Sequence, residues 1–430
     1  MDEIVVTGGR PLTGSVRASG SKNGTLPLLA AALLVDGETV LDNIPTINDV
    51  IIMIEMLRAL GAKCEFVDRA TLKIDASTVN SVSAPYDLVR RMRGSFYVAG
   101  PLLARFGKCE VPLPGGCVIG SRPVDFHIAG FKALGAEVDE RHGVMRAEAS
   151  RLKGTRIFMD PRSRSVGATV NLMLAASMAE GTTIIENASR EPEVVSCQKM
   201  LQACGLDIQG IDTATVTIRG TRRLHEASAR VIPDRMEAGT FLYAAAAATG
   251  DITVEAVAPR DMELVLDVLR RTGAGVTTGE DWIRLRSLSR PLPVDIMTAP
   301  FPGFPTDLQP THGALASIAR GTTIIEETIF DARYNYTDEL ARMGAHIRIV
   351  DSAAIIKGQP KLYAAPVEAT DIRAGAALVV AALAAEGQTE ISGAAFLDRG
   401  YEDLVGKLRG LGAEIVRRGA GASERAVCLG

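Results

Sequence analysis

Hydrophobic and polar positions follow two different periods along this chain, and glycines stand where one period gives way to the other. Runs such as GDITVEA, residues 250–256, alternate polar with apolar side chains, which predicts strands. Runs such as TFLYAAAAAT, residues 240–249, are apolar on nearly every side, which predicts helices that are buried all round. The pattern therefore predicts an α/β fold.

Two glycine landmarks each recur six times, at intervals of about seventy residues. One follows the end of an apolar helix, as in LRALGAKCEF; its members are Gly61, Gly135, Gly205, Gly273, Gly344 and Gly412. The other precedes a β-rich run; its members are Gly37, Gly107, Gly181, Gly250, Gly321 and Gly387. We expect helices to stop at the first set in a left-handed conformation, which side chains with a Cβ resist.

This recurrence predicts six repeats of βαβαββ type that form two pseudo-threefold domains, an inside-out α/β barrel arrangement. A solenoid is disfavoured because its repeats would be shorter and its ends capped by polar residues. We expect residues 22–230 to form the first three-repeat domain. Residues 1–21 with 231–420 would form the second, and 421–430 a C-terminal tail.

Composition excludes several classes of protein. The net charge of −4 over 430 residues gives no electrostatic case for binding nucleic acid or an anionic membrane surface. The most apolar runs reach about half of the roughly 20 residues that cross a bilayer, and the first residues lack the features of a signal peptide. Six cysteines without CxxC spacing and five scattered histidines argue against a zinc site or a disulfide framework. We therefore expect a cytoplasmic protein without metal or cofactor; the oligomeric state stays open.

The candidate chemistry lies in loops bounded by glycine and proline. LPGGCVIGSRPVDFH, residues 113–127, places a cysteine behind two glycines and close to an arginine. Six cations occupy such loops: Lys22, Arg93, Arg122, Arg333, Arg373 and Arg399. A single arginine is most often a solvated surface residue. Six in equivalent loops instead favour a site for anionic substrates, which need several cations against their desolvation.

Nine motifs together resemble the enolpyruvyltransferase family, over about Gly8 to Arg418. They are SGSKNGTLP (19–27), RRMRGSF (90–96), LPGGCVIGSRPVDFH (113–127), SVGAT (165–169), ENASREPE (186–193), PGFPTDLQ (302–309), EETIFDAR (326–333), ATDIRAG (369–375) and LDRGYE (397–402). The loops match the branch that acts on UDP-N-acetylglucosamine. The resemblance implies two domains that close on the substrates, with the active site in the interdomain cleft.

The resemblance also implies a reaction. The enolpyruvyl group of phosphoenolpyruvate passes to the 3′-hydroxyl of UDP-N-acetylglucosamine by addition and elimination through a tetrahedral intermediate, and phosphate is released. This is the first committed step of peptidoglycan precursor synthesis. Both substrates are small molecules, and the chemistry needs no metal and no cofactor.

The implied site residues fall into four groups. The catalytic residues are Cys117 as proton donor, Asp307 near the 3′-hydroxyl, Lys22 and Arg399. The phosphoenolpyruvate contacts are Lys22, Asn23, Arg122, Arg333, Arg373 and Arg399. The UDP-N-acetylglucosamine contacts are Asn23, Arg93, Arg122, Pro123, Val124, Asp125, Phe126, Ser165, Val166, Gly167, Asp307 and Ile329. The supporting acids are Glu191, Glu193 and Asp371, which as loop carboxylates could equally form ion pairs that orient the cations.

Two other functions stay open at this point. A paralogous enolpyruvyltransferase could act on another uridine nucleotide, since Asn48 stands where the family often has a basic residue and residues 161–164 are extra. A non-catalytic nucleotide-sugar sensor is disfavoured, because a binder needs neither an acid such as Cys117 nor a base such as Asp307. Taken alone, Asp307 is also compatible with ordinary turn chemistry.

Overall fold

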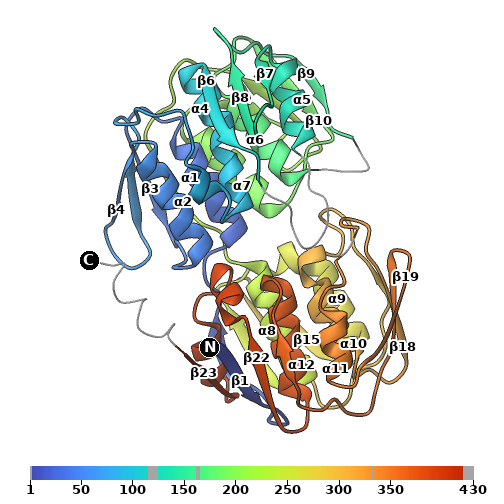
Figure 1. Cartoon of the computed structure of the whole chain (residues 1–430). Coiled ribbons are helices and arrows are strands. Elements are labelled where there is room, and N and C mark those ends of the chain that lie inside the picture. Colours follow the sequence, from blue (N-terminus) through green and yellow to red (C-terminus); the bar gives the residue numbers. More distant parts are fainter. Residues whose placement is uncertain (1, 115–123, 161–164, 332, 420–430) are drawn as a thin grey trace. The chain divides into compact units, whose positions relative to one another are not determined.

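The computed structural model describes residues 2–114, 124–160, 165–331 and 333–419. These residues form two compact units (Figure 1). Unit 1 holds residues 2–19 and 233–419, and unit 2 holds the described residues between 20 and 232. The predicted division into three-repeat domains, 22–230 and 1–21 with 231–420, stays a prediction.

The strands of the described residues form six sheets, three in each unit. In unit 2 the sheet orders are β13(Ala227–Arg230)-β3(Glu38–Asp42)-β5(Leu72–Asp75)-β4(Lys63–Phe66), β9(Arg156–Phe158)-β10(Thr182–Glu186)-β12(Thr215–Arg219)-β11(Asp207–Gln209) and β6(Lys108–Pro112)-β8(Val144–Glu148)-β7(Glu137–Asp139). In unit 1 they are β2(Thr13–Arg17)-β14(Asp251–Glu255)-β16(Trp282–Arg286)-β15(Gly275–Thr278), β17(Ile296–Met297)-β18(Thr322–Glu326)-β20(Ala353–Lys357)-β19(His346–Val350) and β21(Pro366–Glu368)-β22(Gln388–Ser392)-β1(Glu3–Thr7)-β23(Glu414–Arg418).

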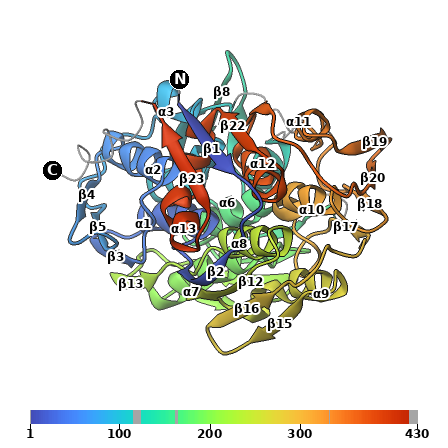
Figure 2. The ribbon, with the colours of Figure 1, turned by 90° about the horizontal axis from the view of Figure 1, so that it is seen from below.

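The five four-stranded sheets share one pairing scheme, a parallel pair followed by two antiparallel pairs. In the last sheet β1 is one of the two inner strands, and it pairs with β22 and β23 from the other end of the chain (Figure 2). The predicted α/β class is confirmed, with mixed sheets. Within the described residues each sheet is open, and none closes into a barrel.

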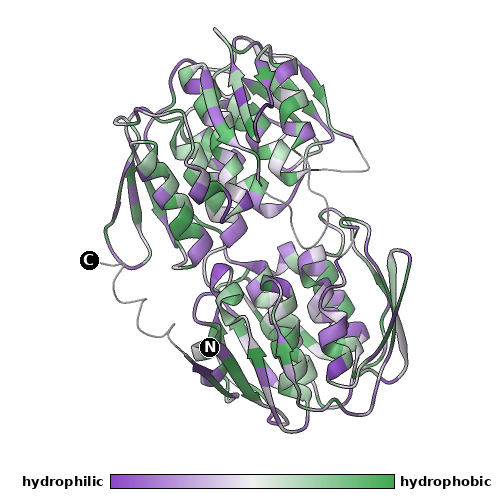
Figure 3. Cartoon of the chain, in the orientation of Figure 1, coloured by the Kyte–Doolittle hydropathy of each residue, from purple (hydrophilic) through white to green (hydrophobic). Residues whose placement is uncertain are grey.

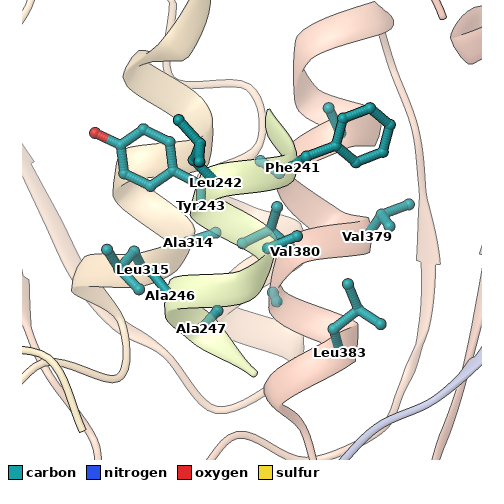
Figure 4. Packing of buried hydrophobic residues seen from close by; sticks show 14 of the residues in the cluster. Phe241, Leu242, Tyr243, Ala246, Ala247, Ala314, Leu315, Val379, Val380 and Leu383 are labelled. Atoms are coloured by element: carbon teal, nitrogen blue, oxygen red, sulfur yellow. The ribbon is translucent and has the colours of Figure 1, made fainter. Parts of the chain in front are cut away.

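Three helices form the centre of unit 1: α8 (Arg235–Ala247), α10 (Gln309–Ala316) and α12 (Ile372–Ala384). They pack on one another through small and branched side chains, including Ala246, Ala314 and Val380 (Figure 4). Nearly every residue of the three helices is buried, as the all-round apolar pattern predicts. The strands around them alternate hydrophobic with hydrophilic residues (Figure 3).

The other helices of unit 1 are α9 (Glu263–Arg271), α11 (Thr337–Arg342) and α13 (Leu404–Gly410), with 3-10 turns η3 (Pro259–Met262), η4 (Thr306–Leu308) and η5 (Ala394–Arg399). Unit 2 contains α1 (Lys22–Ala32), α2 (Asn48–Ala59), α3 (Tyr86–Val89), α4 (Ala99–Phe106), α5 (Asp125–Ala133), α6 (Val166–Ala176), α7 (Pro192–Ala203) and the turn η1 (Arg93–Val98). Its core packs α1 against α2 and α7, and α6 against α4 and α5. None of the helices in the described part of the chain has the length and apolarity needed to span a membrane.

The first glycine landmark adopts the conformation expected from the sequence. All six of its glycines have φ between 90° and 104°, a range in which a Cβ is strained. The helix therefore ends at the same place in each copy, and the chain turns there into a strand.

We predict that Gly100→Ala destabilises unit 2. A Cβ at Gly100, in α4, would lie 2.4 Å from the backbone oxygen of Asn171 in α6, so the two helices would have to move apart. We expect a loss of about 1 to 3 kcal/mol in the free energy of unfolding and a Tm lower by several degrees, measured by calorimetry. Gly410→Ala is the matched control, because a Cβ there meets no atom within 4 Å. Equal Tm values for both variants would contradict the prediction.

Candidate active site

A carboxylate held between two arginines forms the polar centre of unit 1. Asp307, in η4, contacts Arg333 with an Oδ1–Nη2 distance of 2.8 Å. Its Oδ2 accepts hydrogen bonds from Nη2 of Arg373 at 2.8 Å and from Nε at 3.1 Å. Both arginine side chains are about 5% exposed, whereas the Asp307 side chain is 26% exposed. One edge of this carboxylate therefore stays within reach of a ligand.

The start of helix α12 places Arg373. Asp371 is the N-cap, and its Oδ1 accepts hydrogen bonds from the backbone N–H groups of Arg373 and Ala374 at 2.7 and 3.0 Å. The Arg373 guanidinium also donates to the Tyr401 hydroxyl at 3.1 Å and lies 5.5 Å from that ring. Burial by itself would lower the pKa of Arg373, but the Asp307 charge, together with Tyr401 and Asp234, outweighs burial and raises the pKa above its ordinary value. Arg373 is thus a permanent, oriented cation.

Lys22 and Asn23 occupy the first turn of α1 in unit 2. The N-cap Ser21 accepts a hydrogen bond from Gly24 N at 3.1 Å. The Lys22 ammonium lies 3.2 Å from Oδ2 of Asp49, a buried residue in the first turn of α2. A helix start and an oriented ammonium together favour a bound anion such as a phosphate.

Comparison with known proteins identifies the family. The family model for EPSP synthase (3-phosphoshikimate 1-carboxyvinyltransferase) matches residues 6–408. The chain belongs to this family. The predicted membership of the enolpyruvyltransferases is therefore confirmed.

Individual enolpyruvyltransferases can be compared with this chain in sequence and in structure. UDP-N-acetylglucosamine 1-carboxyvinyltransferases from Halorhodospira halophila and Dichelobacter nodosus are 47% and 48% identical over 97% of this chain and 99% of their own. The enolpyruvyl transferase NikO from Streptomyces tendae has a TM-score of 0.88 at 28% identity, covering 97% of this chain and 99% of that one. EPSP synthase from Acinetobacter baumannii shares the fold, with a TM-score of 0.74 at 16% identity and coverages of 97% and 100%.

The other predicted contacts of unit 2 also lie at helix starts. Ser165 is the N-cap of α6 and accepts from Ala168 N at 3.1 Å, which places Val166 and Gly167 in the first turn. Val124 is the N-cap of α5, followed by Asp125 and Phe126. Half-buried Arg93 begins η1, Glu191 is the N-cap of α7, and buried Glu193 lies in its first turn.

Three predicted residues lie outside the described part of the chain: Cys117, Arg122 and Pro123. In unit 1, half-buried Arg399 ends η5, and Ile329, 36% exposed, follows β18. Asp371 caps its helix and also accepts a hydrogen bond from Asn335 Nδ2 at 2.7 Å. These contacts indicate that Asp371 holds the start of α12, and with it Arg373, in position. No cluster of three or more His, Cys, Asp or Glu residues suited to a metal ion occurs within the described residues.

His127 is a site neighbour to which the sequence assigned no role. The Asn171 amide is oriented by its Oδ1, which accepts from Gly100 N at 2.8 Å, so its Nδ2 donates to His127 Nδ1 at 2.9 Å. That bond leaves the imidazole proton on Nε2, which lies 3.3 Å from the place a Gly167 Cβ would occupy. Burial, with the Arg93 charge, lowers the pKa of His127 to about 3. A neutral N–H donor thus lies beside Gly167, which is in the segment predicted to contact the nucleotide sugar. The only signal for His127 in the sequence is a polar residue between the apolar residues Phe126 and Ile128.

We predict that His127→Gln weakens the acid sensitivity of the fold. The histidine of the unfolded chain takes up a proton near pH 6.5, but folded His127 only near pH 3, so its contribution to stability is complete above about pH 7 and falls as the pH drops. Between pH 7 and 5 the wild type should lose about 2 kcal/mol through this group, a loss absent from the variant. Calorimetry at both pH values measures it.

His312→Gln serves as the comparison for that experiment. His312 is buried in unit 1, and burial lowers its pKa to about 4. His312→Gln should therefore remove the part of the pH-dependent stability loss that comes from unit 1, whereas His127→Gln removes the part that comes from unit 2. An unchanged pH dependence in His127→Gln would show that the folded chain already accommodates the protonated ring.

Proposed function

We propose that this chain transfers the enolpyruvyl group of phosphoenolpyruvate to the 3′-hydroxyl of UDP-N-acetylglucosamine, the first committed step of peptidoglycan precursor synthesis in the cytoplasm. The observation that carries the reaction type is the reachable Asp307 carboxylate between buried Arg333 and Arg373. The acceptor follows from 47–48% identity to carboxyvinyltransferases of that name. Another uridine nucleotide is disfavoured, because the relatives at 47–48% identity share a name that specifies UDP-N-acetylglucosamine as the acceptor.

In the addition step, the 3′-hydroxyl gives its proton to Asp307 and its oxygen bonds to C2 of phosphoenolpyruvate. Cys117 supplies the proton that C3 gains, which completes the tetrahedral intermediate. In the elimination step, C3 loses a proton and the C2–O bond to phosphate breaks. Lys22, Arg122 and Arg399 hold the departing phosphate, and Arg333 and Arg373 face the substrate carboxylate.

Asp307 is suited to the role of base by its surroundings. Two guanidinium groups keep the carboxylate oriented, and its 26% exposure leaves room for the acceptor hydroxyl. The same guanidiniums are cations for the phosphoenolpyruvate carboxylate, so base and anion site share one rigid cluster.

The finer architecture belongs to the same proposal: six βαβαββ repeats in two domains, with the active site in the cleft between them. The pairing scheme common to five sheets and the recurrent left-handed glycines support the repeats. The presence of predicted substrate contacts in both units supports a site that two domains complete by closing on the substrates.

We predict that phosphate release from phosphoenolpyruvate requires UDP-N-acetylglucosamine and depends on Asp307. Asp307→Asn should lower kcat at least about a hundredfold, because an amide cannot take up the hydroxyl proton. Asp338→Asn, on the exposed side of α11, is the control and should stay near wild type. The test measures phosphate release from phosphoenolpyruvate in the presence of UDP-N-acetylglucosamine, of UDP-glucose, or of neither. Equal release with all three, or full activity in Asp307→Asn, would refute the proposal.

We further predict that the epoxide phosphonate fosfomycin alkylates Cys117 selectively. A phosphonate would dock at the phosphate site, and the positive charge of Arg122, five residues further along the chain, would favour the reactive thiolate. Four other cysteines are poor competitors, because burial raises the pKa of Cys64, Cys109 and Cys197 to about 12 and that of Cys204 to about 11.

Intact-mass analysis with peptide mapping tests this labelling. We expect one adduct, on Cys117, that forms faster with UDP-N-acetylglucosamine and is absent from Cys117→Ser. Adducts on the four buried cysteines, or an unchanged adduct yield in Cys117→Ser, would contradict a reactive Cys117.

A further inference from the structure

A buried carboxylate without an assigned role lies directly after β18. Glu327 is 3% exposed, and donors from two segments surround it. Its Oε1 accepts hydrogen bonds from Thr298 Oγ1 at 2.9 Å, Ile329 N at 2.9 Å and Phe330 N at 3.2 Å. Its Oε2 accepts from Thr306 Oγ1 at 2.9 Å. One side chain therefore joins the loop that carries Ile329 to the turn that precedes Asp307.

The direction of the Thr306 hydrogen bonds links Glu327 to the proposed base. Thr306 Oγ1 accepts from Arg333 Nη1 at 2.9 Å, and a hydroxyl has a single proton, so that proton points to Glu327. Arg333 in turn holds Asp307 through Nη2 at 2.8 Å. The result is a continuous chain of contacts from Glu327 through Thr306 and Arg333 to Asp307.

We propose that Glu327 is a positioning residue for the reaction proposed above, on which this inference rests. Its carboxylate holds the Ile329 loop, expected at the nucleotide sugar, and the Thr306–Asp307 turn in one fixed arrangement. The acceptor hydroxyl and its base are thereby aligned before the chemistry begins. Glu327 itself contacts no reacting atom and acts through Thr306 and Arg333.

Replacement by glutamine separates the two halves of this role. The amide has the size of the carboxylate, and its oxygen can still accept from Thr298 and from the N–H groups of Ile329 and Phe330. Its NH₂ group then faces Thr306, whose hydroxyl already accepts from Arg333 and must turn its proton elsewhere. Glu327→Gln therefore keeps the loop, but it replaces the charge-assisted hydrogen bond from Thr306 with a weaker, neutral and reversed one, which weakens the link to the base.

The test is a double-mutant cycle on kcat in the full chain, with Glu327→Gln, Thr306→Val and the double variant. Glu327→Gln removes one charge-assisted link, and Thr306→Val removes two, those to Glu327 and from Arg333. We therefore expect kcat to fall about tenfold or more in each, with KM for UDP-N-acetylglucosamine within about twofold of wild type. Because both residues act in one chain of contacts, the kcat of the double variant should be no lower than the kcat of the less active single variant. Thr306→Ser keeps the hydroxyl and should restore kcat.

Thr272→Val is the matched control for loss of a buried hydroxyl. Thr272 donates to Leu269 O at 2.6 Å at the end of α9, in the same unit. It should lower Tm about as much as Thr306→Val and leave kcat unchanged. If Glu327→Gln fails to fold, the Thr306→Val and Thr306→Ser pair decides, since wild-type kcat in Thr306→Val overturns the proposal.

Failure of this inference differs from failure of the proposed function. Additive losses in the cycle, or a rise in KM alone, with normal wild-type turnover, would overturn the role of Glu327 and leave the reaction standing. Absence of UDP-N-acetylglucosamine-dependent phosphate release by the wild-type chain would overturn the proposed function and the role of Glu327 with it.

Discussion

Burial of the central helices on all sides is the constraint on which the rest of this structure depends. A helix such as α8, α10 or α12 has almost no exposed face, so it has no lateral surface on which to carry polar chemistry. Its ends are the exception, because the first N–H groups have no partner inside the helix. Polar side chains on such a helix are therefore confined to its start and to the loop before it.

The distribution of the candidate site follows that constraint in both units. Lys22 begins α1, Ser165 caps α6, Asp307 precedes α10 and Arg373 lies in the first turn of α12. Each position lies at the positive end of a helix dipole, which suits phosphate and carboxylate groups. Substrates with several negative charges fit a scaffold that offers such ends from several helices.

The buried charges of Arg373 and Glu327 in unit 1 are tolerable because each has partners of its own. Arg373 at 4% exposure is neutralised by Asp307 and stacked against Tyr401, and the Glu327 carboxylate is satisfied by four donors. Removing one member of such a network leaves another unpaired in a low-dielectric interior, which costs more than the lost contact. The cluster is accordingly rigid, a useful property where a base must be held against its substrate.

Local sequence determined much of the fold and the family, whereas the roles of the site residues stay predictions. The recurrent glycines marked where helices stop because their left-handed backbone is a local steric property, confirmed at all six positions from Gly61 to Gly412. The apolar runs predicted buried helices, and the loop motifs indicated the family. Strand pairing was beyond this reach: β1 lies between β22 and β23 because three distant segments bury their apolar faces together.

Tertiary structure alone decided which polar side chains meet. Asp307, Arg333 and Arg373 come from three separate motifs, and no local pattern states that one carboxylate bridges both guanidiniums. His127 and Glu327 escaped notice for the same reason, since hydrogen bonds made across the fold give them their environment. Periodicity in the sequence indicates whether a side chain is buried. The hydrogen-bond or ion-pair partner that stabilises a buried polar group can come from a distant part of the chain, so only the tertiary structure identifies it.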